Sequence, residues 1–381
     1  MFIQRLQVSH VRNLSRVALP QLKTINIFYG ANGSGKTSLL EAAHLLLVGR
    51  SFRQSQLRPL LQEDQSQCIV FGELVSAEGH AQSLGISRQR DGSKPVIKLN
   101  GTALGSLSEL VQLAPVQVLS ADSFDMLIGG PSNRRQFLDW GLFHVEPTFF
   151  PAWRLAQRAL KQRNGLIRHG KIDRDQLSLW SREYARYGEQ IDQMRQAYLE
   201  RFLPVARSVI AALSPALADR IDIAYSRGWN KESDLESALL NAVEADIQQG
   251  HTRHGPHRAD LRVYAGSNLA GETLSRGQLK ALVAGFHLAQ AQLLQTMVGR
   301  KSIFLIDDLA AELDREHRRR FCHALEQLNL QILATSIEKA ELIDCWSQPD
   351  RIQMFHVEQG NITPETELET ALAPGELNER R

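Results

Sequence analysis

The chain has 381 residues, enough for two or three compact domains with a substantial core. Its 44 Lys and Arg residues nearly balance its 42 Asp and Glu residues, so the formal net charge is only +2 and any nucleic-acid partner must be bound by a local basic patch. Three widely separated cysteines exclude a disulfide framework and a Cys-rich zinc site, and they favour a reducing cytoplasm. The polar N-terminus and the absence of a long apolar run predict neither a signal peptide nor a membrane span.

The N-terminal part of the chain has the pattern of strands around one glycine-rich loop. We predict strands over 6–8 and 24–29, and the second strand runs into that loop and then into an apolar helix over 38–48. Short apolar runs over 68–75, 83–88 and 96–99 are separated by turn residues and predict an antiparallel meander. A further strand is expected over 116–119.

A long helical region follows the Gly129-Gly130-Pro131 turn and extends to about residue 213. Aromatic and apolar residues recur in it at alternating spacings of four and three, which is the seam of a short coiled coil or helical hairpin: Trp180, Tyr184, Tyr187, Ile191, Met194 and Tyr198. His169 and Gly170, with Asp173, are expected at the tip of this hairpin.

The last third of the chain returns to strands alternating with helices. Strands are expected over 221–225, 260–264, 303–306 and 331–334, and helices over 278–297 and 315–328. The tail over 364–381 is rich in Glu and Thr and poor in apolar residues, so we expect it to be disordered.

The glycine-rich loop matches the Walker A pattern. In this pattern, glycines free backbone N–H groups to bind phosphates, the lysine reaches the β and γ oxygens, and the hydroxyl that follows is a magnesium ligand. The candidate nucleotide-binding residues are Gly30, Ala31, Asn32, Gly33, Ser34, Gly35, Lys36 and Thr37, with Ser38 directly after them.

The apolar run over 303–306 ends in Asp307 and Asp308 and matches Walker B. Asp307 is expected to hold the magnesium shell, and Asp308 stands where a general base can orient the attacking water. Walker A and Walker B must meet at one sheet edge although most of the chain separates them. The intervening segment is therefore an insertion that leaves the ATPase lobe and returns to it.

A third motif stands directly before a predicted helix and resembles the signature of ABC-type ATPases: Leu274, Ser275, Arg276, Gly277 and Gln278. In that class the N-terminus of this helix faces the γ-phosphate held by a second subunit, so a chain with all three motifs is expected to form an ATP-dependent homodimer. Arg276 replaces the usual glycine and either adds a cation near the phosphates or faces solvent.

Two segments after Walker B bear on hydrolysis. Residues 311–314 occupy the place of the D-loop, and Thr335-Ser336 stand where many ABC proteins have a switch histidine. The missing histidine, and Asp308 in place of the longer Glu, predict slow hydrolysis that serves as a timer.

One face of the first helix of the predicted helical hairpin, which we call the arm, is basic. Arg154, Arg158, Lys161 and Arg168 lie at helical spacing and are candidates for DNA contact, although a solvated helix face explains the same pattern.

His251, His254, His257 and Asp260 could be taken as metal ligands, but Pro256 breaks helical spacing and one short segment rarely supplies a whole tetrahedral site. We interpret this segment as a hydrogen-bonded turn that supports the signature helix.

Together these motifs resemble those of the bacterial RecF family, the short-armed relatives of the SMC-type ABC ATPases. The combination of the Gly-Pro-His-Arg segment, the signature and Walker B carries the resemblance, which extends through nearly all of the chain before the tail and includes 11–14, 49–53, 130–135, 161–164, 254–258 and 274–280. It implies that Arg12 and Asn13 approach the nucleotide and that Gln117 is a Q-loop candidate.

The resemblance also implies an architecture: an α/β ABC/SMC-type P-loop ATPase head, with a mixed sheet lobe and an antiparallel β subdomain, plus an inserted helical lobe with a short coiled-coil arm. We expect residues 1–120 and 295–363 to form the ATPase lobe and 121–294 the helical lobe that carries the arm and the signature.

The function implied by the resemblance is an ATP- and Mg²⁺-dependent DNA-binding protein of repair and replication. Heads dimerise on double-stranded DNA near gapped junctions and act with RecR and RecO to help RecA filaments form, without a membrane partner. A transporter subunit shares the ATP motifs but does not need the helical hairpin, and a long-armed SMC head needs far longer arms than this insertion allows.

Overall fold

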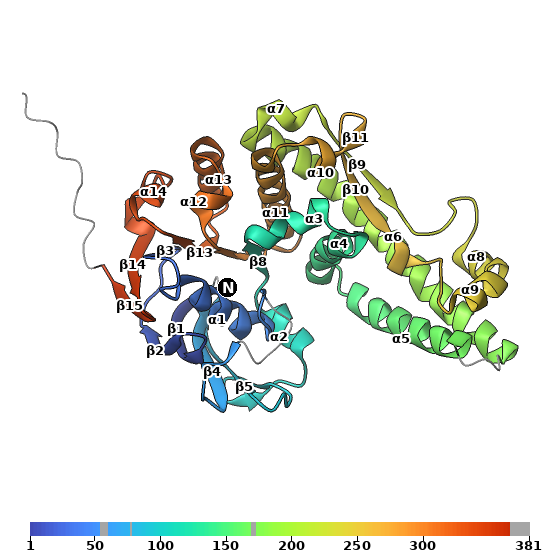
Figure 1. Cartoon of the computed structure of the whole chain (residues 1–381), viewed down its shortest axis with the longest axis horizontal. Coiled ribbons are helices and arrows are strands. Elements are labelled where there is room, and N and C mark those ends of the chain that lie inside the picture. Colours follow the sequence, from blue (N-terminus) through green and yellow to red (C-terminus); the bar gives the residue numbers. More distant parts are fainter. Residues whose placement is uncertain (54–59, 77, 169–172, 366–381) are drawn as a thin grey trace, which may run out of the picture.

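The structure is a computed structural model that describes residues 1–53, 60–76, 78–168 and 173–365. It contains a lobe of two sheets with helices, from which a long helical arm extends to one side (Figure 1). The predicted α/β fold class is confirmed. Within the described ranges, no helix is long and apolar enough to cross a membrane.

An antiparallel sheet forms the outer layer of the lobe, with the strand order β2-β1-β4-β5-β6-β7. Cys68 and Val70 are buried and Ile69 between them is exposed, the alternation of a sheet covered on one face. The meander predicted over 68–99 is confirmed. The strands are β1 (Phe2–Val11), β2 (Leu14–Leu19), β4 (Gln67–Val75), β5 (Ala81–Gln89), β6 (Val96–Leu99) and β7 (Thr102–Ala103).

A mixed sheet forms the second layer, with the order β15-β14-β3-β13-β12-β8. All neighbouring pairs are parallel except β14 and β15. Strands β12 and β13 are buried on both faces; β12 is accordingly a continuous apolar run, whereas β13 has an apolar centre between Gln331 and Thr335. The strands are β3 (Ile25–Tyr29), β8 (Val116–Leu119), β12 (Ile303–Ile306), β13 (Gln331–Ser336), β14 (Ile352–Glu358) and β15 (Asn361–Pro364).

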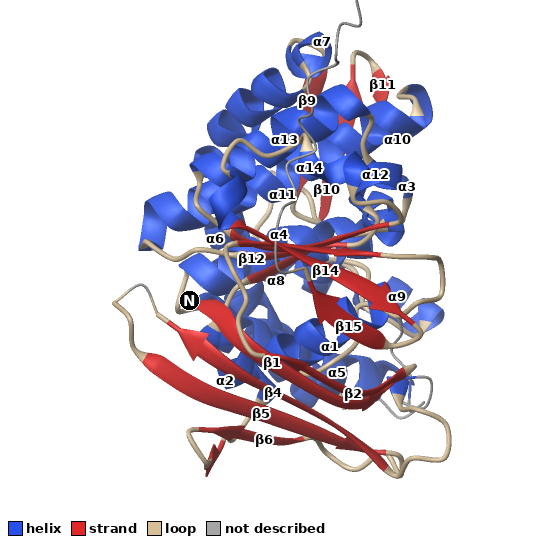
Figure 2. Cartoon of the chain, turned by 90° about the vertical axis from the view of Figure 1, so that its left-hand side faces the viewer, coloured by secondary structure: helices blue, strands red, loops and turns tan. Residues whose placement is uncertain are grey.

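Helix α1 (Lys36–Val48) fills the space between the two sheets, as Figure 2 shows. It is apolar on nearly every side and contributes Leu39, Leu40 and Leu45 to a core shared by both sheets. The Walker A loop at its start is therefore anchored from both layers.

The arm is a pair of long helices, α5 (Phe149–Arg168) and α6 (Arg174–Leu213), which lie side by side (Figure 1). Tyr184, Ile191 and Tyr198 are buried and the other three seam residues are half-buried against the same core, so the predicted seam is confirmed. Asp173 caps α6 through the backbone N–H groups of residues 175 and 176. The expected tip residues, His169 and Gly170, lie outside the described residues.

The remaining elements join the arm to the lobe. Helix α11 (Arg276–Val298) packs against α6 and carries the signature at its N-terminus. A small antiparallel sheet with the order β11-β10-β9 lies beside the arm. The bounds of the other elements are α2 (Leu107–Leu113), α3 (Asp125–Ile128), α4 (Pro131–Val145), α7 (Pro215–Ala218), β9 (Ile221–Ser226), α8 (Leu235–Asn241), α9 (Val243–Gln249), β10 (Asp260–Ala265), β11 (Asn268–Leu269), α10 (Ala270–Thr273), α12 (Leu309–Glu312), α13 (Arg315–Gln327) and α14 (Ala340–Ile343), with 3₁₀ turns η2 (Ala121–Phe124), η3 (Pro256–Arg258) and η4 (Pro349–Arg351).

Two structural observations concern the expected limits of the chain's parts, whose division into lobes stays a prediction. Pro364 was assigned to the tail, but it pairs with Phe355 in β15, an edge strand where proline is tolerated. Glu365 donates its backbone N–H to the Met354 carbonyl at 2.9 Å, and residues 366–381 lie outside the described residues. The expected lobe boundary between 294 and 295 falls inside α11, which runs on to Val298.

Candidate nucleotide-binding site

The Walker A loop lies between the end of β3 and the start of α1. Gly30 and Gly35 have φ angles of 152° and 120°, which side chains rarely adopt, and a Cβ at Gly30 would collide with the carbonyl of Val357. The Lys36 ammonium donates to the carbonyls of Gly30 and Ala31 at 2.6 and 2.9 Å. Burial lowers its pKa, while the Asp308 and Asp307 carboxylates act in the opposite direction.

Walker A and Walker B meet at the carboxyl edge of the mixed sheet. The Thr37 hydroxyl donates to the Asp307 carboxylate, with distances of 2.9 and 3.1 Å to its two oxygens. This contact arises because β3, β13 and β12 are parallel neighbours whose carboxyl ends share one edge. The insertion between the two motifs therefore leaves the lobe and returns to it.

Thr335, at the end of β13, is a site residue to which the sequence analysis gave no role. Its hydroxyl donates to Asp307 Oδ1 at 2.9 Å and accepts a hydrogen bond from the backbone N–H of Asp308 at 2.8 Å. Thr335 occupies the position where many ABC proteins have the switch histidine. This position was the only feature of the sequence that could have indicated a role for Thr335 in the site. Thr335 thus holds both Walker B residues.

Asp308 has a left-handed backbone, with φ at 52°, and is the N-cap residue of α12. A non-glycine residue in this region is uncommon and is often found at functional sites. The conformation directs the chain out of β12 immediately after Asp307, so the two neighbouring carboxylates occupy different positions at the sheet edge.

The oxygen groups at this edge suit a magnesium ion. Mg²⁺ prefers oxygen ligands, and the Thr37 hydroxyl and the Asp307 carboxylate are already within hydrogen-bonding distance of each other. Burial raises the pKa of Asp307, and the hydroxyls of Thr37 and Thr335 and the charge of Arg53 counteract it. A buried carboxylate with mainly hydroxyl partners is the kind of group that a bound cation would stabilise.

The two residues expected near the nucleotide from the first β unit are placed differently. The Asn13 side chain contacts the Walker A loop, donating to the Gly33 carbonyl at 3.2 Å and accepting from the Ser38 hydroxyl at 2.8 Å. The Arg12 guanidinium instead forms two 2.9 Å bonds with the buried carboxylate of Glu41 on α1. Arg12 therefore braces α1 from behind the loop.

The signature residues lie at the N-terminus of α11, where Leu274 is buried and the three residues after it are exposed. Ser275 and Gln278 form a capping box: the Ser275 hydroxyl accepts from the Gln278 N–H at 3.3 Å, and the Ser275 N–H donates to the Gln278 side chain at 3.0 Å. Ser275, Arg276 and Gly277 are exposed, and a Cβ at Gly277 would meet nothing within 4 Å. Arg276 faces solvent in the single chain, and a contact with a second chain's phosphates stays a prediction.

Lys280, one turn further along α11, links the signature helix to the expected D-loop. Its ammonium donates to the Ala311 carbonyl at 2.7 Å, lies 3.6 Å from the Glu312 carboxylate and stands 5.2 Å from the centre of the Phe124 ring. Burial raises the pKa of Glu312. The sequence analysis missed this residue because its partners are set only by tertiary packing.

Gln117, the Q-loop candidate, is buried in β8. Its side chain contacts His287 at 2.6 Å and Gln290 at 3.3 Å, both on α11. It thereby joins the edge of the mixed sheet to the signature helix.

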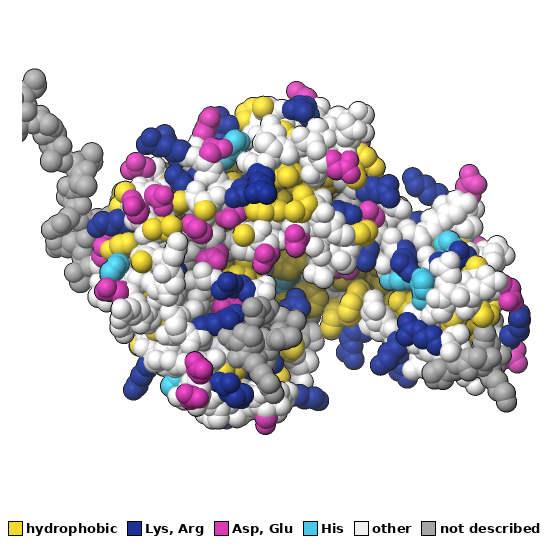
Figure 3. Space-filling view, viewed as in Figure 1, with side chains coloured by type: hydrophobic (Ala, Val, Ile, Leu, Met, Phe, Trp, Pro, Cys, Tyr) yellow, Lys and Arg dark blue, Asp and Glu magenta, His cyan; other side chains and the backbone are white. Residues whose placement is uncertain are grey.

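The four DNA-contact candidates, Arg154, Arg158, Lys161 and Arg168, are all exposed on α5. Lys and Arg side chains are visible along the lower edge of the arm in Figure 3. Arg168 is partly engaged, since its Nε donates to the Gly250 carbonyl at 3.1 Å.

The Gly-Pro-His-Arg segment is a hydrogen-bonded turn, but it does not support the signature helix as expected. The two His257 ring nitrogens bond with the Tyr184 hydroxyl at 2.5 Å and with the Thr252 carbonyl at 3.0 Å, and Arg195 donates to the Pro256 carbonyl at 2.9 Å. Tyr184 and Arg195 belong to α6, so the turn braces the arm. In the described part of the chain, no group of three His, Cys, Asp or Glu side chains is placed to hold a metal.

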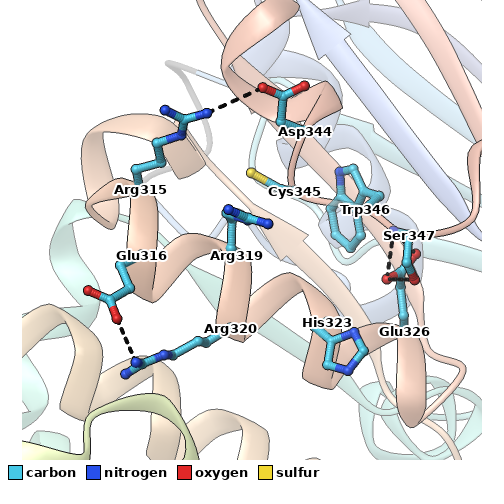
Figure 4. A pocket seen from close by; sticks show the side chains of 10 residues that line it. All are labelled: Arg315, Glu316, Arg319, Arg320, His323, Glu326, Asp344, Cys345, Trp346 and Ser347. Atoms are coloured by element: carbon cyan, nitrogen blue, oxygen red, sulfur yellow. Dashed lines mark hydrogen bonds and ion pairs between the residues drawn. The ribbon is translucent and has the colours of Figure 1, made fainter.

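A separate cavity of about 750 Å³ lies between α13 and the segment after α14, away from the motif residues. Figure 4 shows the ion pairs Arg315–Asp344 and Glu316–Arg320 at its rim and Trp346 on its wall. None of the predicted site residues lines it, so we do not assign it to the nucleotide.

The fold and the paired motifs define a P-loop ATPase head of the ABC/SMC class. The family described as RecF/RecN/SMC N terminal domain matches residues 2–363. The SMC head bound to the C-winged helix domain of ScpA superposes with a TM-score of 0.57 at 15% identity over 97% of this chain and 99% of that one, which supports the fold alone.

Closer relatives identify the branch of this class. The chain is 44% identical over 363 residues to the DNA replication and repair protein RecF of Pseudomonas entomophila (95% of this chain, 98% of the relative) and 43% identical to that of Pseudomonas syringae pv. syringae over the same shares. A structure described as the recombination mediator protein RecF-ATP in the RecFOR pathway has a TM-score of 0.84 and 25% identity, covering 96% of this chain and 97% of that one. The chain belongs to the RecF family.

Proposed function

We propose that this protein binds DNA in an ATP-dependent manner during recombinational repair and replication, and that it hydrolyses ATP slowly. The observation that carries the proposal is the meeting of Thr37, Asp307 and Thr335 at one sheet edge, in a chain that also exposes a signature helix. The named function of the relatives and the ATP complex of one of them support it.

In this proposal the Walker A loop binds the β- and γ-phosphates through its backbone N–H groups and Lys36. Thr37 and Asp307 would hold Mg²⁺, which supplies positive charge against the phosphate oxygens. Asp308 orients the attacking water, and its backbone is already fixed by Thr335.

A second copy of the chain completes the site. The N-terminus of α11 carries the partial positive charge of a long helix, and its exposed Ser275, Arg276 and Gly277 are free to meet the γ-phosphate held by the other copy. ATP thus joins two heads, and hydrolysis separates them.

Two features support slow hydrolysis. Asp308 is one methylene shorter than the glutamate usual at this position, and Thr335 replaces the histidine while bonding to Asp307 and to the Asp308 backbone. We expect a turnover number below about 1 per second, under the typical enzyme value of about 10 per second. Steady-state turnover near 100 per second would contradict a timer role.

The DNA-bound state follows from the arm. We infer that double-stranded DNA is held by its backbone along the basic face of α5, near gapped junctions, because four exposed cations share that face. The RecFOR pathway named for a relative suggests RecR, with RecO, as partners, and assistance to RecA as the outcome. The three free buried cysteines are consistent with action in the cytoplasm.

The experiment that tests the proposal is the oligomeric state of the chain with and without ATP, measured by analytical ultracentrifugation. The wild type should dimerise only with ATP. Lys36→Arg, which perturbs the phosphate contacts, should stay monomeric, and Ser275→Arg should bind ATP yet stay monomeric. A wild-type chain that remains monomeric with both ATP and DNA overturns the proposal.

A further inference from the structure

Two segments that resemble the family but have no role in the nucleotide site meet at the root of the arm. They are residues 130–135, at the start of α4, and residues 254–258, around η3. Between them, and against α5 and α6, lies a pocket of about 220 Å³. Figure 1 shows α4 beside the start of α5 at this junction. The pocket is lined by Ser132, Arg135, Gln136, Asp139, Trp153, Ala156, Gln157, Tyr184, Ile191, Arg195, Pro256 and His257.

The charged groups of this pocket leave one cation without an acidic partner. Arg195 forms two 2.9 Å bonds with the Asp139 carboxylate. Arg135 makes one hydrogen bond, from Nη1 to the Ala259 carbonyl at 2.7 Å, and no carboxylate of the described residues lies within ion-pair distance of it. Its guanidinium has five N–H donors, so most of them remain available to a ligand.

The surroundings of Arg135 favour an anion. Burial and the neighbouring charge of Arg195 lower its pKa more than the Asp139 and Asp260 carboxylates raise it, so a negative ligand in the pocket would stabilise the charged guanidinium. His257 adds no charge at neutral pH, because burial lowers its pKa to about 4 and both of its ring nitrogens are already bonded. Gln136 and Gln157 line the same pocket and can donate to oxygen atoms.

The pocket also continues the basic face of α5. Gln157 lies about 60° around the helix from Arg154, since each residue turns the helix by about 100°. Trp153 and Ala156 lie further round on the same side and form the pocket wall. An extended polyanion that follows Arg154, Arg158 and Lys161 therefore passes the mouth of the pocket.

We propose that the pocket at the arm root, with Arg135 as its cation, binds a backbone phosphate of DNA. The proposal rests on the DNA binding put forward above and gives the two family segments a role: residues 130–135 supply the cation, and the turn at 254–258 closes the pocket behind it. A free phosphate ion has the same chemistry, so the test must use duplex DNA and vary the salt.

The test is the affinity for a 30-base-pair duplex in the presence of saturating ATP and Mg²⁺, measured by fluorescence anisotropy between 0.05 and 0.3 M salt. Arg135→Met should reduce the slope of log K against log salt by about 0.9 and lower the affinity about fivefold at 0.15 M salt, the effect of one lost phosphate contact. Gln157→Glu places a carboxylate in the pocket without removing a bond and should lower the affinity similarly. Gln193→Glu, the same change on an exposed site of α6, is the matched control.

The outcomes separate this inference from the proposed function. If both pocket variants have the same affinity and salt slope as Gln193→Glu, the proposed phosphate site in the pocket is overturned. If the wild type binds no duplex, the proposed DNA-binding function is overturned as well. Arg154→Glu combined with Lys161→Glu reports whether the α5 face binds DNA independently. If Arg135→Met fails to fold, as judged by circular dichroism, Gln157→Glu alone decides the question.

Discussion

The hydroxyl of Thr335 offers the sharpest test of the site. Thr335→Val keeps the volume and the buried methyl group but removes both hydrogen bonds of the hydroxyl, to Asp307 Oδ1 and from the Asp308 N–H. A bond to a charged group contributes about 1.5–3 kcal/mol, and a buried N–H left without its partner costs about 1–3 kcal/mol. Because the site is only partly buried, we expect a loss of about 2–4 kcal/mol in the free energy of unfolding.

The matched control is Thr335→Ser, which keeps the hydroxyl and loses only one buried methyl group. That change should cost about 1 kcal/mol, so serine should be the milder substitution although valine conserves the shape better. Urea unfolding monitored by fluorescence measures both variants.

The same variants test the metal site. The Thr335 hydroxyl stabilises the charged form of Asp307, so its removal raises the pKa of that carboxyl further. We expect the Mg²⁺ concentration for half-maximal ATP hydrolysis to increase by about tenfold in Thr335→Val, because losing a group that hydrogen-bonds to a metal ligand typically weakens metal binding by that amount. In Thr335→Ser this concentration should stay near the wild-type value. Equal Mg²⁺ dependence in both variants, or a more stable valine variant, refutes the role assigned to Thr335.

Two other predictions concern the link between elements and the response to acid. Lys280→Met removes the contacts of α11 with Ala311 and Glu312, so the turnover number should fall about tenfold or more while ATP binding persists and KM changes little. Lys280→Arg should restore part of the rate. Equal losses in ATP binding and in turnover would show that Lys280 has a merely structural role. Burial lowers the pKa of His287 to about 4, below the value of about 6.5 in the unfolded chain. The stability that the neutral ring contributes is therefore fully present above pH 6.5 and is lost as the pH falls toward 4. The free energy of unfolding should decrease over this range by up to about 3 kcal/mol. His287→Gln should flatten the pH dependence of the unfolding free energy over that range, and an unchanged slope would mean that the ring is already protonated in the folded chain.

Local patterns predicted the elements that are buried on both sides or strongly periodic. Strand β12 matches the predicted run over 303–306, and the seam of α6 follows from its alternating spacing. Strands β2 and β14 were missed because polar residues such as Arg16 and His356 interrupt their apolar residues. Strand β2 follows β1 in a tight hairpin, in which Val11 pairs with Leu14, whereas β14 pairs with β3, which is far away in the chain.

The predictions of the site divide in the same way. The contact between Thr37 and Asp307 follows from motif recognition and the rule that parallel strands share an edge. The bond between Arg12 and Glu41 could not be predicted in this way, because a guanidinium next to a phosphate-binding loop is equally compatible with a phosphate partner. The packing of the turn at 254–258 against α6 could not be predicted, because the turn precedes the signature helix in sequence and its contact with Tyr184 is set by tertiary packing.

The geometry of the arm gives a reason why ATP could control DNA binding. A fully buried ion pair, Arg163–Asp246 at 2.8 Å, fixes α5 against α9, and Arg163 also bonds to Ser181 of α6. Helix α6 in turn packs along α11, whose N-terminus carries the signature. The basic face of α5 is therefore held in a fixed relation to the surface that would meet the partner's ATP. If ATP joins two heads as proposed, it also sets the separation of their two basic faces, so a duplex that contacts both should bind more tightly to the ATP-bound dimer than to the monomer.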